Sequence, residues 1–239
     1  MELRLLTTDT ERSTFCYRLE QARVTHGAGF QETSRMRKAN RLRLTFSRLY
    51  GLFEDEAFEP RRMVAGIAMH DLESFPQSCK EPDLTHLPPR AVLECSDHWS
   101  LSRGAGTLAW CGLAVPLRLL EARAVLAYLA ADSVHHTRFY AAMGFRKAGA
   151  PVEHQYVEGP DGERLRVQPM TLEGAALVRT IEALSGLCTE TLANNTVFRL
   201  RDRARPSISR LTSTWEKVAG TGANPHSGVV EAPRLNASA

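Results

Sequence analysis

The sequence lacks the patterns that define several common classes of protein. It has no run approaching the roughly eighteen apolar residues of a membrane span, and residues 1–14 contain no apolar segment of signal-peptide length. Its five cysteines form no Cys-x-x-Cys pair, and no His, Cys and Asp cluster has structural-zinc spacing. Neither a Gly-x-Ser-x-Gly nor a Walker motif is present. These absences predict a soluble cytoplasmic protein with free thiols and without a bound metal.

The excess of positive over negative charge is also small. A formal net charge of +3 suits a site for an anionic cofactor but does not by itself indicate nucleic acid. Two basic segments, 35–48 and 199–210, lack any recognised DNA- or RNA-binding motif or aromatic stacking platform, so nucleic acid is not an expected partner. At 239 residues and 43% hydrophobic, the chain can bury one core and have material left for a tail.

The clearest pattern begins with a small-residue turn at Gly104-Ala105-Gly106. Residues 108–120 follow it and are rich in Leu and Ala, which predicts one buried helix rather than a strand. Pro116 conflicts with that prediction, because a proline inside a helix should kink or break it.

A strand and a second helix come next along the chain. The short apolar run 124–129 is typical of a strand covered on both faces. A helix is predicted over 134–143, closed by Gly144, and Phe145 would lead into the next strand.

This order of elements resembles the acyl-CoA-binding core of the GNAT superfamily of N-acyltransferases. Two motifs carry the resemblance: Arg103-Gly104-Ala105-Gly106 at the turn, and Phe139-Tyr140-Ala141-Ala142-Met143-Gly144-Phe145 at the end of the second helix. In the first motif Arg103 and Gly106 fit the family pattern, whereas Leu108 stands where a second small residue is expected. The resemblance implies an α/β (α+β) fold with a central mixed, mostly antiparallel sheet flanked by helices.

The rest of the chain fits that architecture. We predict strands over 2–7 and 91–99, a helix capped by Asp9 or Thr10, antiparallel strands over 42–54 and 61–71, a hairpin over 151–172 and a helix over 172–187. The proline-rich loop 73–90 is placed beside the substrate channel. The predicted domains are a GNAT-like domain over 1–190, a basic helical extension over 191–219 and a disordered tail over 220–239.

The strand 91–99 should alternate between two faces. Alternation puts Val92, Glu94, Ser96 and His98 on one face and Leu93, Cys95, Asp97 and Trp99 on the other. A carboxylate midway along a buried strand is costly unless it is paired or takes part in chemistry.

Acyl transfer to an amine needs a held thioester, a base for the ammonium and an acid for the departing thiolate. The backbone N–H groups of Arg103, Gly104, Ala105, Gly106 and Thr107 are the expected pyrophosphate ligands, because they open a helix. The resemblance implies Glu94 as the base, acting through water, and Tyr140 as the acid.

Each assignment has an alternative. Glu94 could be a structural carboxylate paired with an arginine, and Tyr140 could be a core aromatic. Asp97 and His98 are alternatives for the base, and His70 with Asp71 could contribute from the neighbouring strand.

The predicted activity is an N-acyltransferase that moves an acyl group from an acyl-CoA or acyl-carrier-protein thioester to a small-molecule amine. The alternative is a GNAT-like module that binds an acyl ligand or a protein without turnover. The length and the proline-rich loop are similar to the branch with acyl-homoserine-lactone synthases and N-acyl amino acid synthases. The basic stretch 35–48 is either a solvated face or a surface for an acidic partner such as an acyl carrier protein.

Overall fold

The structure is a computed structural model that describes residues 1–25, 34–54, 62–102, 104–158, 163–185, 188–189 and 196–200. The first half contains β1 (Glu2–Leu5), α1 (Asp9–Thr25), α2 (Ser34–Phe46), β2 (Arg48–Phe53), β3 (Met63–Asp71), a 3₁₀ turn (Pro89–Ala91) and β4 (Val92–Ser100). The second half contains α3 (Ala105–Gly112), α4 (Ala114–Leu119), β5 (Ala124–Ala130), α5 (Val134–Ala142), β6 (Arg146–Lys147), β7 (Val152–Glu158), β8 (Arg164–Glu173), α6 (Gly174–Ser185), β9 (Cys188–Thr189) and β10 (Thr196–Leu200).

One mixed sheet runs through the molecule. Its strand order is β6-β8-β5-β4-β3-β2-β1-β10-β9, with β7 also paired to β8. Among the described strands, every neighbouring pair is antiparallel except β4 with β5, which is parallel. The predicted fold class, a mixed and mostly antiparallel sheet flanked by helices, is confirmed.

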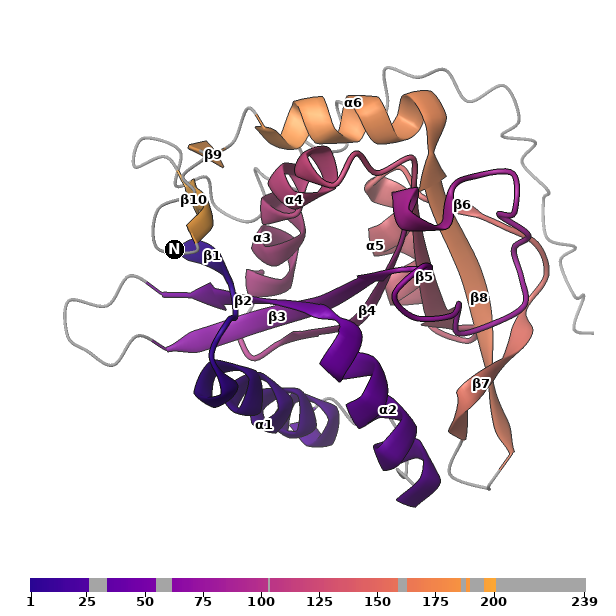
Figure 1. Ribbon diagram of the computed structural model, residues 1–239, viewed down its shortest axis with the longest axis horizontal. Helices are drawn as coiled ribbons and strands as arrows, with labels where there is room; N and C mark the ends of the chain where they lie inside the picture. The colour runs from indigo at the N-terminus through magenta and orange to yellow at the C-terminus, as the bar shows by residue number, and fades with distance from the viewer. Residues whose placement is uncertain are drawn as a thin grey trace, which may run out of the picture.

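Helices cover the two faces of the sheet (Figure 1). On one face Phe15 and Leu19 of α1 and Leu44 of α2 pack in a cluster with Trp99 of β4. We call this side the α1/α2 face. On the opposite side, which we call the α3/α5 face, side chains of α3, α4, α5 and α6 pack with Leu93 of β4 in the larger cluster. Strand β4 is therefore buried from both sides.

The predicted strand 42–54 is half wrong. Residues up to Phe46 belong to α2, and the strand begins only at Arg48, which pairs with Met69 of β3. Leu42 and Phe46 are exposed, whereas Leu44 is buried against α1, so these apolar residues do not share a strand face. Apolar residues at every second position of 42–46 therefore lie on different sides of a helix, and only the pairing of β2 with β3 is confirmed.

The buried helix predicted over 108–120 is two helices, α3 and α4, joined at Leu113. Pro116 lies in the first turn of α4, where its missing N–H costs no intrahelical bond. The chain thus resolves the conflict by starting a new helix just ahead of the proline.

The cap of α1 is Thr8 rather than Asp9 or Thr10. Thr8 Oγ1 accepts from the Glu11 N–H at 3.2 Å, and Glu11 Oε2 accepts from the Thr8 N–H at 3.3 Å. This is a capping box, in which each residue satisfies the other's amide.

The remaining elements follow the predictions closely. The strand at 124, the helix from Val134, the hairpin of β7 with β8 and the final helix are all present. Gly144 ends α5 with a φ of 87°, in the left-handed region.

Beyond residue 190, part of the segment predicted as a helical extension is a strand. β10, Thr196–Leu200, pairs with β1, so the sheet continues past the predicted domain boundary. Residues 201–239, with the predicted tail, lie outside the described residues. In the part of the chain that the structure describes, no helix has the length and apolar character to cross a membrane.

Candidate active site

Strands β4 and β5 form a fork. They pair in parallel from Val92 with Ala124 to Cys95 with Ala127, and no pair between them follows. Beyond this point β4 continues along β3, while β5 continues along β8 to Ala130. The sheet therefore opens next to Glu94 and Cys95.

A β-bulge lies in the β4 arm of the fork. Ala68 pairs with Ser96 and Gly66 pairs with Trp99, so Asp97 and His98 together face one residue of β3. Asp97 has a φ of 47°, a left-handed conformation that Asp tolerates better than most residues. The bulge turns Asp97 and Trp99 to the α1/α2 face and His98 to the α3/α5 face, as their contacts show.

The bulge overturns part of the predicted alternation. The pattern is correct from Val92 to Cys95, but Asp97 and Trp99 do not share a face with Cys95, and His98 does not share one with Glu94. Gly66 makes this arrangement possible, because a Cβ there would lie 2.5 Å from Phe15 and 2.7 Å from Trp99. His98 is consequently excluded as an alternative to Glu94 on the α1/α2 face.

Glu94 is a buried carboxylate with only 1% of its surface exposed. The Ser78 N–H donates to its Oε2 at 2.9 Å, and the Ser78 hydroxyl donates a short hydrogen bond to its Oε1. Burial raises the pKa of Glu94 above its ordinary value, although the Ser78 hydrogen bonds and Arg43 act in the opposite direction. A raised pKa makes the ionised carboxylate a stronger base than an exposed glutamate.

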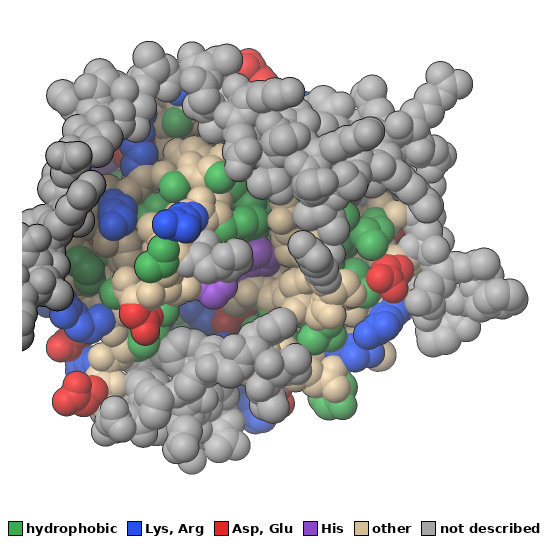
Figure 2. Space-filling model, turned by 180° about the vertical axis from the view of Figure 1, so that it is seen from behind, with side chains coloured by type: hydrophobic (Ala, Val, Ile, Leu, Met, Phe, Trp, Pro, Cys, Tyr) green, Lys and Arg blue, Asp and Glu red, His purple; other side chains and the backbone are tan. Residues whose placement is uncertain are grey.

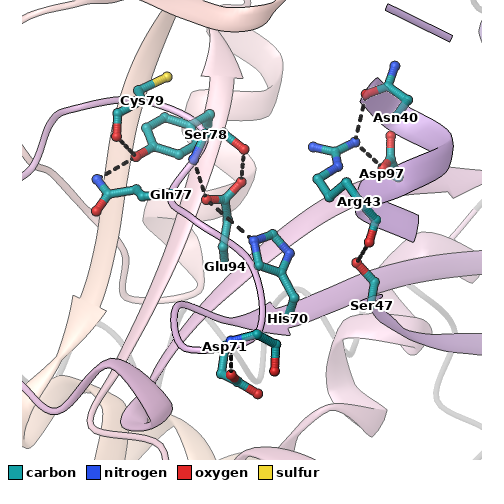
Figure 3. Close-up of polar contacts among 12 residues, drawn as sticks. Asn40, Arg43, Ser47, His70, Asp71, Gln77, Ser78, Cys79, Glu94 and Asp97 are labelled. Atoms are coloured by element: carbon teal, nitrogen blue, oxygen red, sulfur yellow. Dashed lines mark hydrogen bonds and ion pairs between the residues drawn. The ribbon is translucent and has the colours of Figure 1, made fainter. Parts of the chain in front are cut away.

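His70 of β3 lies beside this carboxylate. Its Nε2 is 3.9 Å from Glu94 Oε2, and neither ring nitrogen has a hydrogen-bond partner among the described residues. Burial and the neighbouring Arg43 lower the pKa of His70 to about 4, so the imidazole is neutral near pH 7. Asp71, the other predicted contributor, instead pairs with Arg48 at 2.9 Å. Figure 3 shows Glu94 between Ser78 and His70.

Asp97 is held by two arginines from the helices. Arg23 of α1 lies 2.9 Å from its Oδ1, and Arg43 of α2 makes a short contact with its Oδ2. Burial would raise the pKa of Asp97, but these two guanidinium groups outweigh it and hold that pKa below its usual value. Asp97 is therefore an ionised carboxylate that is paired with both helices.

The predicted pyrophosphate turn lies at the open end of the fork. Gly104 precedes α3 with a φ of 78°, and Ala105, Gly106 and Thr107 form the first turn of the helix. The ring of His98 bonds the carbonyl oxygen of Gly106 through Nε2 at 3.1 Å, which ties β4 to this turn. Arg103, the remaining member of the predicted set, lies outside the described residues.

Tyr140 packs on the α3/α5 face. It is 4% exposed, and its ring makes edge contacts with Trp110 at 5.3 Å and Phe145 at 5.1 Å between centroids. Burial raises its pKa, so the phenol stays protonated. Glu94 and Tyr140 therefore lie on opposite faces of the fork, with the opening between them.

Three residues of the site were not singled out from the sequence. Ser78 and Tyr128 fasten the loop after β3 to the fork, and Arg43 pairs with Asp97 although it was counted only as one member of a basic run. Their signals are weak because a serine in a loop and an arginine in a basic helix are usually solvated.

The surface seen from behind is hollowed near its centre, and histidine side chains line the hollow (Figure 2). On the α3/α5 face, the half-buried His98 stacks on Phe139 at 6.0 Å between centroids. Among the described residues, no group of three or more His, Cys, Asp and Glu side chains is arranged to hold a metal ion.

Solved structures share this architecture. A GCN5-related N-acetyltransferase from Brucella melitensis matches with a TM-score of 0.52 at 12% identity, over 88% of this chain and 90% of that chain. FeeM, an N-acyl amino acid synthase from uncultured soil microbes, matches with a TM-score of 0.50 at 14% identity, over 72% and 89%. No family model and no curated protein matches the sequence.

At these identities the likeness shows the fold. The chain has the fold of the GNAT N-acyltransferases, and the resemblance predicted from Arg103–Gly106 and Phe139–Phe145 is confirmed at that level.

Proposed function

We propose that this protein is an N-acyltransferase that moves an acyl group from a CoA or carrier-protein thioester to a small-molecule amine. The observation that carries the proposal is the buried Glu94 at the β4/β5 fork, in a fold that this chain shares with N-acyltransferases. A buried carboxylate with a raised pKa is a common choice for a catalytic base. The position of Glu94 next to the opening agrees with such a role, because a base there would lie close to a thioester bound in the fork.

The reaction requires the amine to attack the thioester carbonyl from the face that carries Glu94. An N–C bond forms and the C–S bond breaks. The proton of the ammonium passes to Glu94 through a water molecule. The neutral His70, 3.9 Å from Glu94, can accept or donate a hydrogen bond to that water without adding a charge.

The thiolate leaves on the α3/α5 face, where Tyr140 is proposed to protonate it. A phenol with a raised pKa remains protonated near pH 7 and can act as an acid. Separation of acid and base across the fork suits a thioester lying in the opening, because the entering nitrogen and the leaving sulfur are different substituents of the tetrahedral carbon and point in different directions.

The donor's pyrophosphate is proposed to bind the first turn of α3. The N–H groups of the first turn of a helix lack intrahelical partners and point toward an anion. Gly106 lets this turn pack closely on β4, since a Cβ there would lie 3.0 Å from His98 Nε2.

Mass spectrometry tests the proposal. The purified protein is incubated with a panel of acyl-CoA and acyl-carrier-protein donors and pooled amines. Release of free thiol together with a new acylated amine is the expected result. Donor binding without turnover would support a non-catalytic acyl-binding module instead. With no donor binding, residues 104–107 would be only a helix start, and the proposal would fail.

A further inference from the structure

The loop between β3 and β4 is fastened to both strands of the fork. Ser78 donates to both carboxylate oxygens of Glu94 on β4. The hydroxyl of Tyr128 on β5 accepts from Gln77 Nε2 at 2.7 Å and donates to the Glu81 carbonyl oxygen at 2.8 Å. Figure 3 shows Ser78 at the Glu94 carboxylate, with Gln77 and Cys79 further along the same loop.

These fastening points lie where the two strands separate. The last pair between the two strands is Cys95 of β4 with Ala127 of β5. Glu94 immediately precedes Cys95, and Tyr128 immediately follows Ala127. The segment Gln77–Glu81 therefore spans the fork on the α1/α2 face, which is the face from which the amine must approach under the proposed function.

Ser78 gives Glu94 the hydrogen bonds that a bound amine would otherwise donate. It offers one N–H and one O–H, and each takes one carboxylate oxygen. Because Glu94 is almost fully buried, a water or an amine reaches these oxygens only when the segment moves. A closed segment and a bound acceptor thus compete for the same carboxylate.

We infer that Tyr128 is a positioning residue that holds the segment Gln77–Glu81 closed over Glu94 and thereby weakens acceptor binding. The inference rests on the proposed function, because it assigns the competing ligand as the amine. The Tyr128 hydroxyl bonds the segment on either side of Ser78, so its loss favours the open segment, in which Ser78 is separated from Glu94.

Hydrogen–deuterium exchange and steady-state kinetics of Tyr128→Phe test this role. Loss of a neutral hydrogen bond shifts an equilibrium by roughly five- to tenfold. We expect amides of 77–81 to exchange about fivefold faster, and the KM for the amine to fall by about as much, with the KM for the donor unchanged. Adding the amine to wild-type protein should also speed exchange in the same segment.

Ser78→Ala is a second variant that removes only the hydroxyl donor, and it should shift both readouts in the same direction by less. Tyr17→Phe, at an exposed position on α1, is the matched control and should match wild type. Unchanged exchange in both test variants, an amine KM that rises, or protection of the segment by the amine would overturn the inference. Faster exchange in the variants, without turnover of any donor and amine, would support the role of Tyr128 in closing the segment but would count against the proposed function.

Discussion

The two faces of β4 bury their side chains by different means. On the α1/α2 face, Glu94 and Asp97 are charged or polar and find their partners in Ser78, Arg23 and Arg43. On the α3/α5 face, His98 and Cys95 lie among rings, with Trp110, Phe139, Tyr140 and Phe145 in mutual edge or stacked contacts.

The difference shows how one strand serves two chemistries. A buried ion pair needs correct partners and fails when one is removed, whereas an aromatic cluster tolerates the loss of a polar atom. Under the proposed function, the α1/α2 face, or polar face, would take up the proton of the amine. The α3/α5 face, or aromatic face, would contain the thioester sulfur. Variants on the two faces should therefore affect activity and stability differently.

The largest expected effect is on the rate after Glu94→Gln. General acid–base catalysis contributes about 10²–10⁴-fold, so we expect kcat/KM to fall by about 10³-fold. Glutamine keeps the shape and accepts a hydrogen bond, which should preserve the fold by circular dichroism.

Glu153→Gln, at an exposed position on β7, is the control and should keep its full rate. Full activity in Glu94→Gln would show that this carboxylate only holds Ser78 and the loop.

Arg43→Met should have the next largest effect, this time on stability. The Arg43 side chain is 7% exposed, and its removal leaves Asp97 with Arg23 alone. Breaking a buried pair by removing one partner costs about 3–5 kcal/mol, and we expect the lower end because Arg23 remains. Urea unfolding followed by circular dichroism measures the change.

Arg41→Met, on the exposed side of the same helix, should stay within about 0.5 kcal/mol of wild type. Equal losses in the two variants would mean that the buried ion pair adds nothing to the polar face.

Acidification should lower stability through histidines on both faces. His70 on the polar face and His98 on the aromatic face each have a pKa lowered to about 4, mainly by burial. In the unfolded chain these histidines bind protons below about pH 6.5, whereas in the folded chain they do so only near pH 4. Their contribution to the free energy of unfolding is therefore complete above about pH 6.5 and is lost as the pH falls toward 4. At about 1.36 kcal/mol per pKa unit, each histidine lowers the free energy of unfolding by roughly 3 kcal/mol between pH 6.5 and pH 4.

The measurement is the free energy of unfolding at several pH values for wild type and His98→Gln. The variant should lose less stability between pH 6.5 and pH 4, even if its stability at pH 8 is lower. An unchanged slope would show that folding does not lower the pKa of His98.

The sequence predicted the parts of this site that depend on local pattern. Period-two alternation correctly placed Glu94 inside the sheet, and the glycine after Tyr140 correctly ended α5. The motif at 104–107 correctly opened a helix after β4. In each case a short stretch determines the local backbone by itself.

The parts that failed depend on distant partners. The bulge at Asp97 requires Gly66 on β3 and two arginines from α1 and α2, none of which is near it in sequence. The burial of Arg43 depends on how α2 packs, and a helix whose charged residues are all basic gives no local sign of which one is buried. The Thr8 cap is different, because its Thr-x-x-Glu pattern is a local signal of a capping box.

Tyr140→Phe has the smallest expected effect and divides the aromatic face into packing and chemistry. Phenylalanine keeps the ring contacts with Trp110 and Phe145, so unfolding should change by no more than about 1 kcal/mol. If the phenol protonates the leaving thiolate, kcat should fall by about 10²-fold, at the lower end for general acids. Tyr50→Phe, another buried tyrosine in the same core cluster, should leave kcat unchanged. Equal kcat values in the two variants would assign Tyr140 to packing, and the departing thiolate would then take its proton from water.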